Sequence, residues 1–102
     1  MKLSEMTTSE CAKALTQDEF AAWTRSGAFA LVEYLEQMED EYRTQIEFDR
    51  VALRCEYSEY DTAIEAAQAY TSEFTTEESA LEYLENNTTV INHANGIIVQ
   101  DF

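Results

Sequence analysis

The sequence predicts an α+β domain in which several short helices pack on a three-stranded antiparallel sheet that ends in a C-terminal β-hairpin. Three observations predict this fold class. A Thr-x-x-Glu pattern typical of helix starts occurs four times, one segment has the apolar repeat of an amphipathic helix, and Asn95-Gly96 separates two β-rich runs. The length of 102 residues, with no Pro and two Gly, predicts one acidic domain over residues 1–102.

The four Thr-x-x-Glu patterns are interpreted as capping boxes, in which a Thr hydroxyl and a Glu carboxylate bind backbone N–H groups of a first helical turn. The pairs are Thr7/Glu10, Thr16/Glu19, Thr62/Glu65 and Thr75/Glu78. The first two predict short helices that start near residues 8 and 17. Ser26-Gly27 then predicts an interruption before a longer helix.

Residues 28–42 are predicted to form the best-defined helix, because apolar residues recur there at steps of three and four. These residues are Ala28, Leu31, Val32, Leu35, Met38 and Tyr42. The outer face carries Glu33, Glu36 and Asp40, and Glu39 and Glu41 add charge near the C-terminal end. This charge opposes the helix dipole, which favours cations at that end.

Residues 50–57 are predicted to form a strand, because apolar and polar residues alternate there. The apolar positions are Val51, Leu53, Cys55 and Tyr57. Ile46 and Phe48 alternate with the opposite parity. Their parity predicts a bulge or turn near Asp49-Arg50, or a separate short strand before it.

Two further helices are expected over residues 62–70 and 75–86. On the second, Glu78, Glu82 and Glu85 form a stripe on the side away from the leucines. They repeat the acidic pattern of the longest helix.

The C-terminal segment is expected to form two strands, over residues 88–94 and 97–101, that pair across Asn95-Gly96. An isolated hairpin is only marginally stable in water. The strand with Leu53 and Cys55 is therefore expected to complete the sheet, with helices packed on one of its faces.

The composition indicates a folded protein, since 45% of the residues are apolar and twelve are aromatic. No apolar run is long enough for a signal peptide or a membrane span, which predicts a soluble, cytoplasmic protein. Cys11 and Cys55 lack the spacing of a metal or redox pair, so we expect two reduced thiols that serve as small buried hydrophobes.

The charge is the strongest functional signal, because 21 Asp and Glu against six Lys and Arg give a formal charge of −15. A small domain is soluble at a magnitude of roughly 2 to 8. The negative sign argues against direct binding of DNA, RNA or anionic membranes, which need cations to neutralise phosphate. The expected partner is a basic surface, and nucleic-acid-binding proteins carry such surfaces.

No catalytic motif is found in the sequence. The nucleophile elbow GxSxG, the phosphate loop, zinc-ligand spacing and the calcium loop D-x-[DN]-x-[DN]-G are all absent. His93, the one histidine, lies beside Asn92 and is interpreted as a strand or surface residue. We therefore expect a protein without enzymatic activity, cofactor or metal.

The two acidic stripes are the remaining candidates for a binding site. Carboxylates three and four positions apart on a helix lie about 5–6 Å from one another, so each stripe is a fixed row of charge. Such a row suits a groove lined by Arg and Lys, as duplex DNA does. An ordinary solvated helix face is one alternative, and the presence of only two lysines, Lys2 and Lys13, argues against it. Halophilic adaptation is a second alternative that also explains few lysines, but it does not explain why the acidic residues are mainly Glu concentrated on helices.

Several tyrosines could anchor a protein interface among these charges. They are Tyr34, Tyr57, Tyr60, Tyr70 and Tyr83. A core or half-buried role is the main alternative for Tyr57 and Tyr70. Tyr60, between Glu59 and Asp61, is the best candidate for an anchor.

In its small size, its acidity and its lack of a catalytic motif, the chain resembles the small phage-encoded inhibitors of bacterial defence. These are the anti-CRISPR and anti-restriction proteins, several of which mimic DNA. The C-terminal half, residues 51–102, also resembles a recurring half of uncharacterised phage and prophage proteins. The specific parts are VALRCEYSEYDTAIEAAQAY and LEYLENNTTVI followed by NGIIVQDF.

This resemblance implies a non-enzymatic inhibitor that binds the basic nucleic-acid-binding surface of a defence complex, most plausibly a CRISPR effector, and blocks target DNA. The expected interface residues are Glu33, Glu36, Glu39, Asp40, Tyr60, Glu78, Glu82 and Glu85. The alternative is an acidic interaction module, such as an antitoxin-like neutraliser or a phage accessory protein, that binds through an apolar, Tyr-rich surface.

Overall fold

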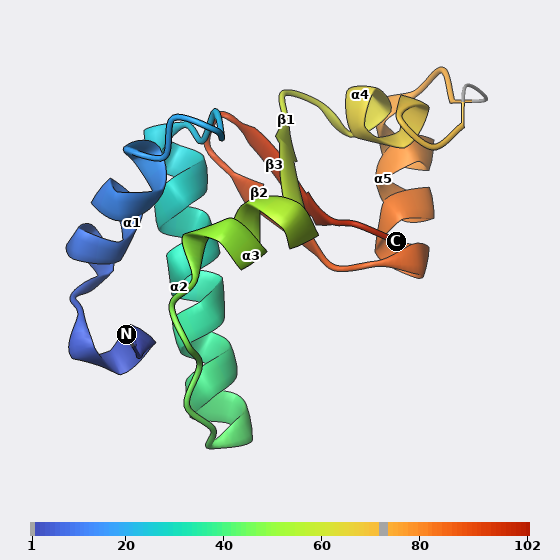
Figure 1. The fold of residues 1–102 in the computed structure, drawn as a ribbon. Coiled ribbons are helices and arrows are strands. Elements are labelled where there is room, and N and C mark those ends of the chain that lie inside the picture. The colour runs from blue at the N-terminus through green and yellow to red at the C-terminus, as the bar shows by residue number, and fades with distance from the viewer. Residues whose placement is uncertain (1, 72–73) are drawn as a thin grey trace.

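A computed structural model describes residues 2–71 and 74–102, and it shows five α-helices and a three-stranded antiparallel sheet within them. The elements in chain order are η1 (Leu3–Glu5), a 3-10 turn, α1 (Thr8–Thr16), α2 (Arg25–Tyr42), α3 (Arg50–Glu56), β1 (Tyr57–Tyr60), α4 (Ala63–Gln68), α5 (Glu77–Asn87), β2 (Val90–His93) and β3 (Gly96–Gln100) (Figure 1). This architecture confirms the predicted α+β class.

The C-terminal strand β3 is the centre of the sheet, whose strand order is β1-β3-β2. Both neighbours run antiparallel to it, with Glu59 opposite Ile98 on one side and His93 opposite Gly96 on the other. The predicted hairpin around Asn95-Gly96 is therefore confirmed.

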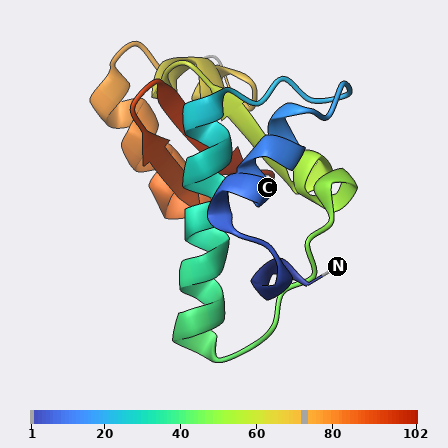
Figure 2. The same ribbon diagram turned by 90° about the vertical axis from the view of Figure 1, so that its left-hand side faces the viewer.

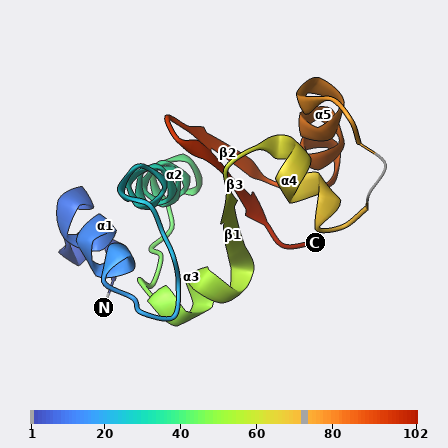
Figure 3. The same ribbon diagram turned by 90° about the horizontal axis from the view of Figure 1, so that it is seen from above.

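Helices cover both faces of the sheet, so the expectation that they pack on one face is wrong (Figure 3). Successive residues of a strand point to opposite faces. Accordingly, Ile98 packs in a core with α1 and α2, whereas Ile97 and Val99 pack in a second core with α4 and α5. Figure 2 shows α2 lying across the first of these faces.

The predicted start of α1 is confirmed in detail. The Glu10 N–H donates to Thr7 Oγ1 at 3.1 Å, and the Thr7 N–H donates to Glu10 Oε1 at 3.0 Å. These hydrogen bonds with Thr7 hold the pKa of the Glu10 carboxyl below its usual value. Both groups of the capping box are therefore used as expected.

The helix predicted from residue 17 does not exist, because α1 ends at Thr16 and residues 17–24 contain no helix. Asp18 explains the difference. Its carboxylate accepts the Phe20 N–H at 3.0 Å and pairs with Arg54 at 3.0 Å. A short polar side chain that binds nearby backbone in this way competes with helix formation.

The longest helix, α2, starts three residues earlier than predicted, at Arg25. The side chain of Thr24 caps it by accepting the Gly27 N–H at 3.0 Å. Ser26-Gly27 therefore lies inside the first turn and does not interrupt the helix.

The strand predicted over residues 50–57 is wrong, since Arg50–Glu56 forms the helix α3 and strand β1 begins only at Tyr57. Asp49 starts this helix by accepting the N–H groups of Val51 and Ala52. The two inward positions are Leu53 and Tyr57, which fit a helical step of four as well as a strand alternation.

The segment before α3 forms a single bridge between Lys2 and Glu47 in place of a strand. Ile46 and Phe48, on either side of that bridge, both pack against the core of α1 and α2. The separate short strand suggested by their alternation is therefore replaced by this one bridge.

The last two helices agree with the predicted segments. Thr62 caps α4 as expected, by accepting the Glu65 N–H. The cap of α5 is Thr76, one residue after the predicted Thr75. Glu77, in the first turn of α5, accepts the N–H groups of Ala63 and Ile64 and so joins the starts of the two helices.

Gly27 should not tolerate a side chain, although Ala is normally the better helix residue by about 1 kcal/mol. A Cβ at this position would collide with the Glu59 carboxylate, with Cδ only 2.6 Å away. We expect Gly27→Ala to lower the free energy of unfolding by about 1–3 kcal/mol, because Glu59 loses its hydrogen bonds. Urea denaturation measures the change. The cost should shrink when Glu59→Ala is already present, and an equal cost in both backgrounds would contradict the collision.

The buried Tyr57 should make stability depend on pH in the alkaline range. Burial, and then the nearby Tyr34 and Glu56, raise the pKa of Tyr57 from 10.0 to about 12. Stability from the neutral phenol is present below pH 10 and is lost as the pH rises through the folded pKa. Urea titrations between pH 10 and 12 should show this loss. It should be smaller in Tyr57→Phe and unchanged in Tyr42→Phe, which alters an exposed tyrosine.

Candidate functional site

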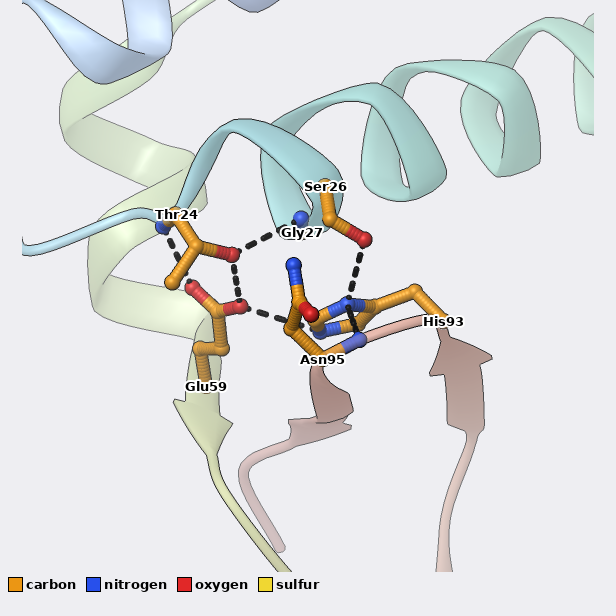
Figure 4. A network of polar contacts seen from close by, with 6 residues as sticks. All are labelled: Thr24, Ser26, Gly27, Glu59, His93 and Asn95. Carbon is orange, nitrogen blue, oxygen red and sulfur yellow. Dashed lines mark hydrogen bonds and ion pairs between the residues drawn. The ribbon is translucent and has the colours of Figure 1, made fainter.

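A polar network is centred on the Glu59 carboxylate of β1 (Figure 4). Its Oε1 accepts the Thr24 N–H at 2.8 Å, and its Oε2 accepts the Thr24 hydroxyl at 2.5 Å. His93 Nε2, on β2, lies 2.9 Å from the same Oε2. Glu59 therefore joins two strands of the sheet to the start of α2.

His93 is held from its other nitrogen as well. Nδ1 lies 2.8 Å from Ser26 Oγ and accepts the Asn95 N–H at 3.3 Å (Figure 4). A backbone N–H can only donate, so Nδ1 is the acceptor in its contact with Asn95. No acceptor among the described residues is well aligned with Nε2, so its contact with Glu59 is mainly electrostatic.

This network places the Ser26 hydroxyl, the His93 imidazole and the Glu59 carboxylate in a row. No sequence motif indicated this arrangement. Ser26 and His93 are 67 positions apart, so only the fold brings them together. The His93 side chain is 3% exposed. With Nδ1 shared with a backbone amide and Nε2 poorly aligned with Glu59, the geometry is that of a clamp between α2 and the hairpin.

The acidic residues expected on α2 divide into two groups. Glu36 accepts the Thr8 hydroxyl at 2.9 Å, and Glu39 accepts the Ile46 N–H at 2.7 Å, so both hold neighbouring segments against the helix. Glu33 and Asp40 are exposed and have no hydrogen-bond or ion-pair partner among the described residues. Only this second pair has carboxylates fully available to a partner.

The acidic residues expected on α5 are all available. Glu78, Glu82 and Glu85 are exposed, and none of them pairs with another described residue. The inward side of the helix is formed by Ala80 and Leu84, both fully buried. The stripe therefore lies on the solvent side of the helix, as predicted.

The structure does not bring the two stripes together. Figure 3 shows α2 on one side of the sheet and α5 on the other. A flat or gently curved partner surface therefore meets one stripe at a time. The acidic residues expected to form one interface therefore belong to two separate surfaces, one on α2 and one on α5.

The charge is unevenly divided along the chain. Residues 1–54 contain eleven Asp and Glu and six Lys and Arg, whereas residues 55–102 contain ten Asp and Glu and no Lys or Arg. The formal charges are therefore −5 and −10. The second part includes α4 and α5, so the helix with three available carboxylates belongs to the part without cations. This count was a signal in the sequence that could have singled out α5.

Tyr60 lies on β1 and packs half-buried in the core with α4 and α5. Its neighbour in the sheet is Ile97 of β3. Its proposed role as an interface anchor stays a prediction, and any partner would meet only part of its ring.

An aromatic cluster near the C-terminal residues contains two rings that are more exposed than Tyr60. Tyr70 stacks on Phe102 with centroids 4.2 Å apart, and Tyr83 contacts Phe74 at 4.8 Å. Tyr70 is 36% exposed and Phe102 is 47% exposed. Burial and the nearby Asp101 raise the pKa of Tyr70. The cluster ties the end of β3 to α4 and α5.

The two thiols lie in different environments. Cys11 is buried, and its burial, with the nearby Glu36, raises the pKa of the thiol. Cys55 is exposed, and neither forms a disulfide. Cys11 is a core residue as expected, but Cys55 does not serve as a small buried hydrophobe.

The described residues contain no group of three or more His, Cys, Asp or Glu arranged to hold a metal ion. No helix within them is long and apolar enough to cross a membrane.

Comparison of the chain with protein-family models, curated proteins and solved structures finds no match. The function is therefore argued from the geometry and charge of the residues alone.

The division of the α2 carboxylates can be tested by two matched substitutions. Glu36→Ala and Glu33→Ala remove the same charge from the same helix. We expect Glu36→Ala to lower the free energy of unfolding by about 0.5–1.5 kcal/mol, because the Thr8 hydroxyl loses its partner. Glu33→Ala should change it by less than about 0.5 kcal/mol. Urea denaturation gives both values, and equal effects would mean that Glu36 is merely a surface charge.

Proposed function

We propose that this protein is a non-enzymatic inhibitor of a bacterial defence system, which binds the basic nucleic-acid-binding surface of a CRISPR effector and blocks target DNA. We assign the contact to the outer face of α5, with Glu78, Glu82 and Glu85 as its central residues. The observation that carries this assignment is the concentration of charge, because residues 55–102 have a formal charge of −10 and no Lys or Arg.

The face of α5 has the rigidity that a charge mimic needs. Ala80 and Leu84 lock one side of the helix into a core with Ile97 and Val99 of the sheet. Thr76 caps its start, and Glu77 binds it to α4. The three outer carboxylates therefore keep the spacing of about 5–6 Å between neighbours that a helix imposes.

A fixed row of carboxylates suits a groove that normally holds phosphates. Arg and Lys in such a groove gain charge-assisted contacts with carboxylates as they do with phosphate oxygens. The net charge of the chain also accelerates the encounter by long-range attraction, which salt weakens. These effects support competition with DNA and do not require any chemistry at the site.

The acidic face of α2 supplies the matched control. Glu33, Asp40 and Glu41 are exposed on a helix on the opposite side of the sheet. In the proposed complex these residues point away from the contact. Their charge contributes to long-range attraction but not to the close contacts.

A second candidate function, an interaction module with an apolar surface, is favoured by one specific feature. Phe20 is 74% exposed and Val51 is 50% exposed. They line a common groove with Arg50 and Arg54, and the Arg54 guanidinium lies 5.3 Å from the centre of the Phe20 ring. An exposed ring beside two cations is typical of protein interfaces.

Charge reversal on α5 is the direct test. We expect Glu78→Lys, Glu82→Lys and Glu85→Lys together to weaken binding to a purified effector complex by at least about a hundredfold, and to restore target-DNA binding in a mobility-shift assay. The reason is the loss of three contacts, each worth on the order of 1 kcal/mol or more. Glu33→Lys, Asp40→Lys and Glu41→Lys together change the net charge equally and should weaken binding far less.

The two triple variants also decide between the candidate functions. Equal weakening by both would mean that net charge alone drives binding, which contradicts the assignment to α5. Full inhibition by the folded α5 variant would exclude mimicry through this face. Capture that survives 0.5 M salt and is lost with Phe20→Ser would support the apolar interface instead.

A further inference from the structure

We propose that the hollow between α1 and the first turns of α2 is a binding site for a small anion that carries a flat aromatic ring. The hollow has a volume of about 610 Å³, within the range of small-molecule sites. Both helices lie on the opposite side of the sheet from α5 (Figure 3), so the hollow is distinct from the surface assigned to the protein partner.

The walls of this hollow come from two helices and the loop between them. The α1 wall is one face of the helix, formed by Ser9, Ala12, Lys13 and Thr16 at steps of three, one and three. The opposite wall consists of Arg25 and Phe29, one turn apart on α2, with Trp23 just before the helix. The contact between α1 and α2 therefore determines its shape.

The charges around the hollow are opposite in sign to those of the chain. Lys13 and Arg25 line it, and none of the carboxylates in the described part of the chain does. Neither cation forms an ion pair with another described residue. Two like charges beside one hollow repel each other, and an anion between them replaces this repulsion with two charge-assisted contacts.

The other wall residues indicate that the anion carries a ring. Trp23 and Phe29 offer aromatic surfaces, and rings stack on such surfaces favourably. Trp23 is 9% exposed, and its indole nitrogen is buried. The Ser9 hydroxyl, which has no partner among the described residues, adds a neutral donor to the wall.

The strong overall charge of the protein does not prevent this binding. Interactions between exposed charges are largely screened beyond about 10 Å at 0.1 M salt. Helix α5, with its exposed carboxylates, lies across the sheet from α1 and α2 (Figure 3). Both charged residues that line the hollow are cations, and they lie next to a bound anion.

Phenyl phosphate is a suitable probe, because it combines an anion with one ring. The chain has a single tryptophan, so the indole N–H of Trp23 gives one signal in a ¹⁵N NMR spectrum. At 0.1 M salt we expect phenyl phosphate to shift this signal in a saturable way. Benzyl alcohol, which lacks the charge, and inorganic phosphate, which lacks the ring, should each bind at least about tenfold more weakly.

Three charge-matched variants locate the site. Lys13→Gln and Arg25→Gln should each weaken phenyl phosphate binding by roughly tenfold or more, because each removes one charge-assisted contact. Arg50→Gln removes an exposed cation that does not line the hollow and should leave binding within about twofold. An unchanged overall spectrum of each variant confirms its fold.

The outcomes separate the parts of the proposal. No saturable shift of Trp23, or equal weakening by all three variants, would overturn it. Equal binding of inorganic phosphate would overturn the requirement for a ring. A parallel titration with benzoate distinguishes a carboxylate ligand from a phosphate ligand, and tighter binding of either probe supports the proposal for that anion. The α5 charge-reversal variant should bind phenyl phosphate normally, which keeps this test independent of the proposed function.

Discussion

The arrangement of the elements depends on the contacts of one carboxylate, Glu59. It accepts both the backbone N–H and the hydroxyl of Thr24, and it lies 2.9 Å from His93. These partners belong to the start of α2 and to β2, so one side chain connects the helix with two strands. Because the carboxylate occupies the space beside Gly27, the first turn of α2 requires a residue without a Cβ. A polar cluster of this kind is stabilising only when nearly all of its groups are satisfied.

The sheet that Glu59 helps to position also separates the charged surfaces. Ile98 packs toward α2, whereas Ile97 and Val99 pack toward α5, so the two acidic helices lie on opposite faces. The strongest uncompensated charge is on the α5 side, and the cationic hollow beside α1 is on the other. One small chain thus carries an acidic surface on one side of the sheet and, separately, a hollow lined by two cations.

The successes and failures of the predictions have a common physical cause. Thr7 and Glu10 act within one turn, so the α1 cap follows from neighbouring residues. The helix predicted after Thr16 does not form. The nearby Asp18 carboxylate binds Arg54 of the distant helix α3 and the backbone of its own loop. In residues 50–57, an alternating pattern fits a strand and also fits a short helix with Leu53 and Tyr57 inward. The cap at Asp49 and the packing of those two residues decide for the helix.

The sequence by itself determined the α+β class, the hairpin, the longest helix and the acidic stripe of α5. Each depends on local periodicity, turn chemistry or charge, which are encoded within a few residues. Only the tertiary structure decided that the stripes lie apart, that Glu36 and Glu39 hold other segments, and that Ser26, Glu59 and His93 meet. It also placed Lys13 and Arg25 beside one hollow. These features join positions far apart in the chain, and no local pattern records which distant groups will satisfy one another's hydrogen bonds and charges.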